Sequence, residues 1–186
     1  MIVRSVALFA AVALAAGTVA LAQMTPGTTK VVKYSAAAMI ATGHVSGHCW
    51  TSSIASRRSD AFRCMTGNEI HDPCFEVDAK SVACPDEAAL NTGVVINLTK
   101  PLPPAQPSPP SPQAWAMVLE SGAHCSRATG TVDPGYPYYC TGVRGQCAAP
   151  DLSKVKQSYV VRCAKSVTLA GKAEDVAPTL VKIVYE

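Results

Sequence analysis

The chain has 186 residues, with 16 Lys and Arg against 13 Asp and Glu and a net charge of +3. So small a charge, without a polybasic run, excludes the strong positive field by which proteins bind nucleic acid or anionic membranes. The length suits one domain or two very small ones.

Residues 1–22 have the order of a cleavable export signal. Arg4 supplies a positive charge, an apolar run follows from Val6 to Leu14, and small residues precede the expected cleavage site. Removal of this segment leaves 164 residues with a net charge of about +2. No later run reaches the roughly 18 apolar residues of a membrane span. We therefore predict a periplasmic or secreted protein that begins at Gln23.

All cysteines lie after this signal and would fold in an oxidising compartment. An even number there is most simply explained by disulfides, whereas in the cytosol the same number would indicate metal binding or catalysis. The eight residues are Cys49, Cys64, Cys74, Cys84, Cys125, Cys140, Cys147 and Cys163.

Short segments rich in β-branched and aromatic residues, separated by Gly, Pro, Asp and Ser, predict a mainly β protein. We expect a small disulfide-stabilised β domain, sandwich or barrel-like, with few short helices and with one domain or two subdomains. A helical turn is predicted at 59–65, where Ser59 can cap backbone amides. The predicted strands are 30–34, 94–99, 114–120, 136–141, 158–163 and 180–185.

A proline-rich segment divides the chain after the first four cysteines. Seven of the twelve residues from Pro101 to Pro112 are proline. Such a run can neither continue a helix nor supply the amide donors of a sheet. We predict an exposed linker or loop at 101–112 between an N-terminal cysteine-rich half, 23–100, and a C-terminal cysteine-rich β half, 113–186.

This segment also discourages bridges between the two halves. Pairing inside each half gives short loops, which meet often in the unfolded chain and are favoured among about 105 possible arrangements. The predicted disulfides are Cys49–Cys64, Cys74–Cys84, Cys125–Cys140 and Cys147–Cys163, with separations of 15, 10, 15 and 16 residues.

Two polar clusters are candidate metal sites, but neither has the required spacing. His44 and His48 would share a face of a helix, but the surrounding Gly and Ser favour loop or strand. The acidic stretch 69–78 lacks the central glycine of a calcium loop, so we interpret it as a solvated turn held by Cys74. We predict no metal and no cofactor.

Over six residues, from Gly47 to Ser52, the chain resembles the segment around the nucleophile of papain-like cysteine proteases. That resemblance implies Cys49 as nucleophile with His124 as a distant base. The family's upstream glutamine has no counterpart here, and one free thiolate would leave another cysteine unpaired. We therefore interpret Cys49 as a structural half-cystine packed beside Trp50 and predict no catalytic residue.

Three tyrosines around Pro137 are the residues that we favour for ligand binding. Tyr136, Tyr138 and Tyr139 lie among Pro and Gly, and aromatic side chains on loops supply contact area at low conformational cost. Alternation along a strand would instead bury Tyr138 with Cys140 and expose Tyr139, so one or two of these rings can belong to the core.

Five short motifs cover most of the chain after the signal: CWTSS from Cys49, DAFRC from Asp60, NEIHDPCF from Asn68, TKPLP from Thr99 and WAMVL from Trp115. With them the chain resembles a group of exported, cysteine-rich bacterial proteins that have no assigned biochemistry. The resemblance implies that Cys147 and Cys163 are additions to six cysteines that recur in the group. It implies no activity.

No triad, metal set or phosphate loop is visible in the sequence. We therefore expect a disulfide-stabilised binding or interaction protein whose ligand is extracellular or in the cell envelope. The alternative is a small cell-envelope hydrolase that acts on peptidoglycan or peptide through catalytic residues that the sequence does not identify.

Overall fold

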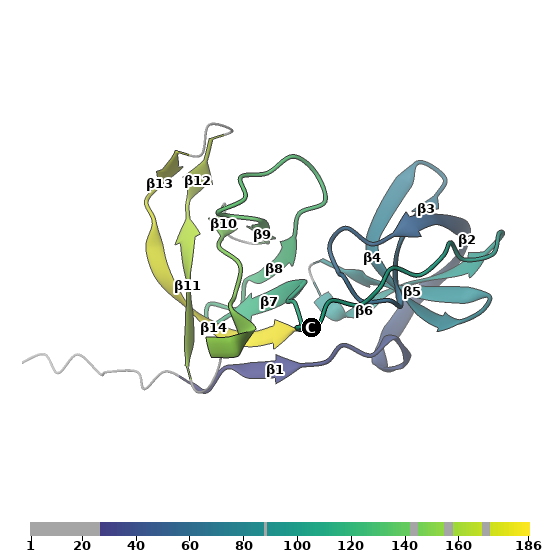
Figure 1. Ribbon diagram of the computed structural model, residues 1–186, viewed down its shortest axis with the longest axis horizontal. Coiled ribbons are helices and arrows are strands. Elements are labelled where there is room, and N and C mark those ends of the chain that lie inside the picture. Colours follow the sequence, from purple (N-terminus) through teal and green to yellow (C-terminus); the bar gives the residue numbers. More distant parts are fainter. Residues whose placement is uncertain (1–26, 88, 142–144, 155–157, 169–171) are drawn as a thin grey trace, which may run out of the picture.

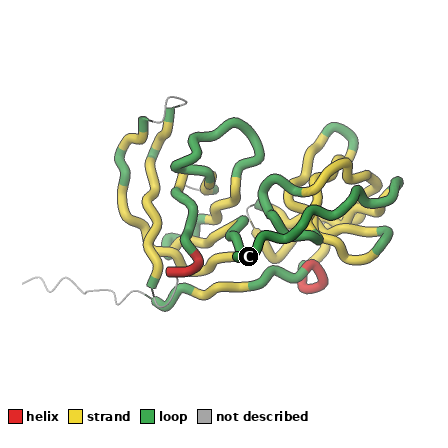
Figure 2. The backbone as a smooth tube through the Cα atoms, in the orientation of Figure 1, coloured by secondary structure: helices red, strands yellow, loops and turns green. Residues whose placement is uncertain are grey.

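The computed structural model describes residues 27–87, 89–141, 145–154, 158–168 and 172–186, so the predicted signal lies outside the described residues. Within these ranges the chain is mainly β, as predicted. Its helical part consists of two short turns, η1 (Ala36–Ala38) and η2 (Leu152–Lys154) (Figure 2). The strands form two closed barrels, which lie side by side along the long axis of the molecule (Figure 1).

The first barrel is made of five strands that follow one another in the chain. They are β2 (Ile40–Ser52), β3 (Ala61–Thr66), β4 (Glu69–Asp78), β5 (Ser81–Asp86) and β6 (Ala89–Leu98). Each strand runs antiparallel to the one before it. The fifth strand therefore has the direction of the first, and β6 closes the barrel by pairing with β2 in parallel.

Two segments of the first barrel differ from the sequence prediction. The helical turn predicted at 59–65 is instead occupied largely by strand β3, where Phe62 and Cys64 are buried and Cys64 lies directly opposite Cys49. The acidic stretch predicted as a solvated turn is strand β4, in which Cys74 is buried. In both segments, burial and strand pairing outweigh the local preference for a helix cap or a loop.

The second barrel is a ring of six strands. In ring order they are β7 (Ala116–Leu119), β8 (His124–Arg127), β9 (Tyr138–Cys140), β10 (Gln146–Cys147), β11 (Tyr159–Ala164) and β14 (Ala177–Tyr185). Because the number of strands is even, the ring closes with an antiparallel pair, β14 and β7. The short strands β12 (Ser166–Val167) and β13 (Ala173–Glu174) pair separately.

Strand β1 (Lys30–Val32) precedes the first barrel in the chain but pairs with the second. It runs parallel to the end of β14, from Lys30 opposite Ile183 to Val32 opposite Tyr185. Figure 1 shows β1 beside β14, after which the chain enters the first barrel. Two chain connections therefore cross between the barrels, one after β1 and one through the proline-rich segment.

A buried aromatic cluster fills the contact between the barrels. The ring of Tyr34 lies 4.7 Å from that of Phe75 and 5.3 Å from that of Trp115, and Trp115 lies 6.0 Å from Tyr185. We call these four residues the aromatic seam. Trp115 is only 1% exposed. Aromatic pairs of this kind contribute about 0.5–1.5 kcal/mol each beyond the area they bury, so the seam stabilises the contact between the barrels.

Each barrel has its own core and two disulfides between neighbouring strands. Every bridge joins two cysteines within one barrel, and none joins a residue before Pro101 to one after Pro112. The bridges are Cys49–Cys64, Cys74–Cys84, Cys125–Cys140 and Cys147–Cys163, the same four pairings that the sequence predicts.

Residues 101–112 form no strand, as expected for a run with few amide donors. Leu102 packs against the core of the first barrel. The side-chain nitrogen of Gln106 lies 3.1–3.4 Å from three carbonyl oxygens, those of Ser53, Ser56 and Arg58. The proline-rich segment is therefore attached along the loop that joins β2 to β3.

Candidate binding surface

The structure separates the three tyrosines that the sequence favours for binding. Tyr139 is 47% exposed and Tyr136 is partly buried, so both rings offer some surface. Tyr138 is 2% exposed, and its hydroxyl donates a hydrogen bond of 2.6 Å to the carbonyl of Ala114. Tyr138 therefore belongs to the core, because alternation along β9 points it inward, and its side chain is not available to a ligand.

A second group of exposed apolar side chains lies on the first barrel. Trp50 is 41% exposed and Ile54, in the loop after β2, is 50% exposed. The pairing of β2 with β3 shifts between Cys49 and Thr51, so Trp50 is the extra residue of a β-bulge. Trp50 follows the buried Cys49, so the ordinary alternation of a strand points its ring to the surface, and the bulge leaves its backbone outside the paired ladder.

An arginine completes this surface. Arg63 on β3 places its guanidinium carbon 5.7 Å from the centroid of the Trp50 ring. A cation at that distance contributes about 0.5–1 kcal/mol at an exposed site. Arg63 lies in a second register shift, opposite Asp72 and Pro73 on β4, and its Nη1 is 3.7 Å from Asp72 Oδ2. We call Trp50, Ile54 and Arg63 the Trp50 surface.

The buried carboxylate of Asp72 holds this surface in place. It accepts hydrogen bonds from the Ser53 hydroxyl and from the backbone amides of Ile54 (3.1 Å) and Ala55 (3.5 Å). Burial raises the pKa of Asp72, against the lowering effects of these hydrogen bonds and of the Arg63 charge. A buried charge is costly unless it is paired. Asp72 has three hydrogen-bond donors and the Arg63 guanidinium as partners, and it links the Ile54 loop to Arg63.

The proline-rich segment supports the same loop from another direction. Ser52 donates a hydrogen bond of 3.4 Å to the carbonyl of Pro104, and Gln106 binds the carbonyls of the following residues. The loop from Ser53 to Arg58 thus lies between Asp72 and the proline-rich segment. The exposed side chain of Ile54 is carried by a backbone that is fixed on both sides.

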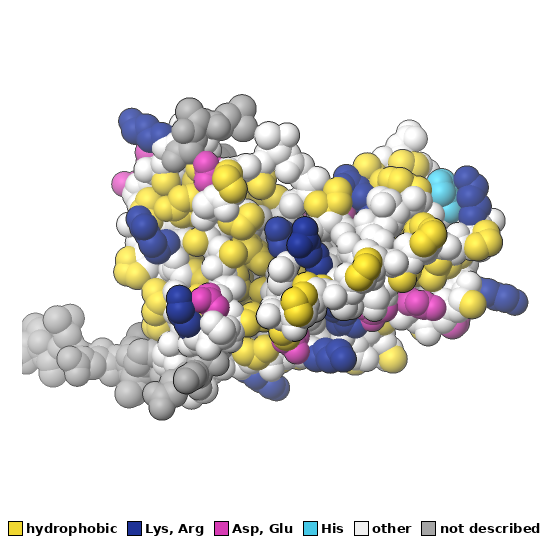
Figure 3. Space-filling view, viewed as in Figure 1, with side chains coloured by type: hydrophobic (Ala, Val, Ile, Leu, Met, Phe, Trp, Pro, Cys, Tyr) yellow, Lys and Arg dark blue, Asp and Glu magenta, His cyan; other side chains and the backbone are white. Residues whose placement is uncertain are grey.

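A groove of about 470 Å³ lies between this loop and the proline-rich segment. Lys33, Arg57 and Arg58 line it, and Arg58 is already engaged. Arg58 donates to both carboxylate oxygens of Asp60 and, at 2.7 Å, to the carbonyl of Tyr34. Figure 3 shows basic and acidic side chains scattered over the visible face rather than gathered by sign. Lys33, Arg57 and Arg58 face Asp60 and Glu186 in the lining of the groove, so its charges are of mixed sign.

The candidate metal ligands of the sequence are spread along strands. His44 and His48 both lie on β2, where a rise of about 3.3 Å per residue separates their backbones by roughly 13 Å. The carboxylates of the stretch 69–78 are likewise distributed along β4. Among the described residues, the one cluster with metal-ligand spacing is Cys125, Cys140 and Cys147, and disulfides occupy all three sulfurs.

Two sets of residues, Cys49 and a cluster on the β3–β4 hairpin, are candidates for the catalytic residues of a hydrolase. Cys49 is bridged to Cys64, and the chain has no free cysteine, so no thiolate nucleophile is present. Thr66 Oγ1 lies 2.9 Å from His71 Nε2, and Glu69 lies 3.9 Å from that same nitrogen. A catalytic triad needs the nucleophile and the carboxylate on opposite nitrogens of the imidazole. This hairpin grouping does not have that geometry.

The sequence points to Trp50 only as a neighbour of Cys49 and to Asp72 only as one acid of the stretch 69–78, and it does not point to Ile54 or Arg63. One signal was available: if Cys49 points inward on a strand, the residue beside it points outward. The contacts of Arg63 and Asp72 depend on two register shifts between strands, and no local pattern displays these.

Comparison with known proteins adds no relative: no protein-family model, no curated protein and no solved structure matches the chain. Within the described part of the chain, no helix is long and apolar enough to cross a membrane. The four disulfides are typical of proteins outside the cytosol.

Proposed function

We propose that this chain is a secreted or periplasmic binding module that recognises a partner protein through the Trp50 surface. The observation that carries the proposal is the position of Trp50, a large exposed ring stacked on Arg63. Tryptophan and arginine are enriched among the residues that dominate binding energies at protein interfaces. Ile54 extends the apolar area beside them.

Pre-organisation is the second support for this proposal. Asp72 and Gln106 fix the loop that carries Ile54, and the Cys49–Cys64 disulfide ties β2 to β3 at the residue before Trp50. A surface whose backbone is already ordered loses less conformational entropy on binding, so more of the contact energy becomes affinity. The disulfides serve the same purpose, because they hold β2 to β3 and β4 to β5 around the surface.

A displayed library of random peptides tests this proposal. Peptides selected on the oxidised protein are measured by calorimetry against Trp50→Ala and Ile54→Ala. We expect at least about a tenfold loss of affinity in Trp50→Ala, the size of effect typical of a truncated hot-spot residue. The matched control is Tyr139→Ala, which removes a ring of similar exposure from the second barrel. Selected peptides that bind Trp50→Ala as tightly as the unaltered protein would contradict the proposal.

Export is tested separately by intact mass. We propose that the mature protein begins at Gln23, on the charge and apolar pattern of residues 1–22. The expected mass, with the eight cysteines oxidised, is that of residues 23–186. A mass that includes the first 22 residues would exclude cleavage while leaving the proposal for the Trp50 surface intact.

A further inference from the structure

Four consecutive strands of the second barrel each carry one cysteine. Cys125 on β8 lies directly opposite Cys140 on β9, and Cys147 on β10 lies directly opposite Cys163 on β11. β9 and β10 are also neighbours, with Cys147 opposite Tyr138. Tyr138 and Cys140 are two residues apart and share one face of β9, so Cys140 lies diagonally across from Cys147.

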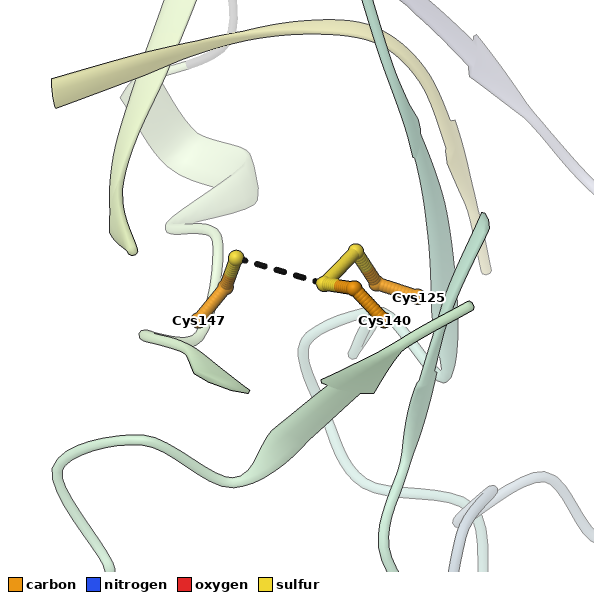
Figure 4. A group of neighbouring side chains, drawn as sticks. All are labelled: Cys125, Cys140 and Cys147. Atoms are coloured by element: carbon orange, nitrogen blue, oxygen red, sulfur yellow. Dashed lines mark hydrogen bonds between the residues drawn. A yellow bond between two sulfur atoms is a disulfide. The ribbon is translucent and has the colours of Figure 1, made fainter. Parts of the chain in front are cut away.

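The two bridges of this barrel are in contact. The sulfurs of Cys140 and Cys147 are 3.4 Å apart, and those of Cys125, Cys140 and Cys147 lie within 4.8 Å of one another (Figure 4). Both bridges are oxidised, so neither sulfur carries a proton. Cys125 and Cys147 are buried, whereas Cys140 and Cys163 are partly exposed. Each bridge therefore joins a buried cysteine to a partly exposed one.

We propose that these two bridges form one coupled thiol–disulfide exchange unit that reacts with dithiol reductants. A thiolate of the reductant attacks Cys163, forms a mixed disulfide there and releases Cys147 as a thiolate. The Cys147 thiolate is already beside Cys140. It attacks that sulfur, forms a Cys140–Cys147 bridge and releases the Cys125 thiolate. The second thiolate of the reductant then displaces Cys163.

Electrons and atoms balance over this sequence. One dithiol is oxidised to its cyclic disulfide, and its two protons end on Cys125 and Cys163. One bridge is lost, and the other moves from the β8–β9 pair to the β9–β10 pair. Attack at the partly exposed Cys163 therefore frees both β8 and β11 from their disulfides, although the reductant never reaches the buried Cys125.

The first barrel contains two bridges without this contact. Across β3 and β4, Cys74 lies opposite Phe62, two residues from Cys64, but the register shift between Phe62 and Cys64 inserts an extra β4 residue between the two bridges. No three sulfurs of this barrel, all of which the structure describes, lie within 4.8 Å of one another. We therefore expect no exchange between the bridges of the first barrel, which serves as an internal control.

The test compares Cys163→Ser with Cys84→Ser, each of which leaves one buried cysteine without its partner. The oxidised variants are alkylated in denaturant at mildly acidic pH and mapped without reduction. In Cys163→Ser we expect Cys125 to be the main alkylated residue and Cys140 to be joined to Cys147. In Cys84→Ser we expect alkylation of Cys74 with the other bridges unchanged. Alkylated Cys147 together with an intact Cys125–Cys140 bridge would overturn the proposal.

A second measurement on the unaltered protein does not depend on the folding of a variant. The protein receives one equivalent of dithiothreitol, and the singly reduced species is alkylated and mapped. The expected species carries alkyl groups on Cys125 and Cys163 and a bridge between Cys140 and Cys147. Recovery of the second-barrel thiols as an original pair, either Cys147 with Cys163 or Cys125 with Cys140, would show that the bridges react independently and would overturn the proposal.

Discussion

The first barrel has five strands and the second has six, and this difference decides how each one closes. In both barrels every strand reverses the direction of its predecessor in the ring. The number of reversals is one less than the number of strands. With five strands it is even and the last strand is parallel to the first, whereas with six it is odd and the last strand is antiparallel to the first. The five-stranded barrel therefore closes through the parallel pair β2 and β6, whereas the six-stranded barrel closes through the antiparallel pair β14 and β7.

The same comparison explains why only one pair of bridges is in contact. Both barrels place one cysteine on each of four successive strands. In the first barrel the register shift around Asp72 and Pro73 offsets the second bridge from the first. In the second barrel the pairing of β9 with β10 brings Cys140 beside Cys147. The register between two neighbouring strands thus decides whether the two bridges of a barrel are in contact.

The largest expected effect comes from breaking the aromatic seam. Trp115→Ala removes a fully buried ring between the barrels and should lower the free energy of unfolding by about 3–5 kcal/mol. The same change at Trp50 removes an exposed ring and should alter it by no more than about 0.5–1 kcal/mol. Denaturant unfolding followed by circular dichroism measures both. Equal losses in the two variants would show that the seam does not stabilise the contact between the barrels.

Alkaline pH should destabilise the second barrel through Tyr138. Burial raises the pKa of Tyr138 from 10.0 to about 12. The folded state therefore holds the phenol proton more tightly than the unfolded state. This contribution is fully present below pH 10 and is lost as the pH rises to about 12, a change of roughly 3 kcal/mol.

Tyr138→Phe sharpens this test, because it removes the titrating group along with the hydrogen bond to Ala114. Its unfolding free energy, measured across the same pH range, should fall less steeply than that of the unaltered protein. Part of the decrease in the unfolding free energy of Tyr138→Phe at alkaline pH should remain, because burial also raises the pKa of Tyr34 to about 12. The exposed Tyr139→Phe is the matched control. Identical slopes in the Tyr138 and Tyr139 variants would remove Tyr138 as the cause.

In the first barrel, the buried polar group to test is the carboxylate of Asp72. Asp72→Ala leaves the Ser53 hydroxyl and the amides of Ile54 and Ala55 without their acceptor and should cost about 2–3 kcal/mol. Glu76→Ala changes an exposed carboxylate on the same strand and should leave the unfolding midpoint nearly unchanged. The denaturant concentration at the unfolding midpoint, measured for both variants, tests this difference. If Asp72→Ala unfolds at the midpoint of Glu76→Ala, the buried carboxylate does not hold the loop.

The smallest effect is expected in the proline-rich segment that connects the barrels. Gln106→Ala removes the amide that binds the carbonyls of the loop after β2 and should cost about 1 kcal/mol. Limited proteolysis without reductant should then cleave within 101–112 faster than in the unaltered protein. Gln113→Ala, an exposed position near the end of the segment, is the control. Unchanged cleavage in Gln106→Ala would mean that this contact does not restrain the segment.

Local sequence patterns predicted part of this structure and missed another part for identifiable reasons. We favoured Tyr138 for binding with Tyr136 and Tyr139, and the alternative reading, that alternation buries Tyr138 and exposes Tyr139, is the one that the structure shows. The pattern at 59–65 predicted a capped helical turn, yet β3 occupies most of it, because Phe62 and Cys64 gain more from burial in a barrel than Ser59 gains as a cap. A short segment does not reveal which neighbour will bury it.

The cysteine spacing and the proline run by themselves favoured the disulfide pairing that the structure has, because cysteines separated by short loops meet often in the unfolded chain. Composition likewise determined the β class. Only the tertiary structure decided that β1 joins the second barrel, that Arg63 lies between Trp50 and Asp72, and that Cys140 touches Cys147. These contacts depend on the register between strands and on the closure of the barrels, which are properties of the assembled sheet rather than of any one segment.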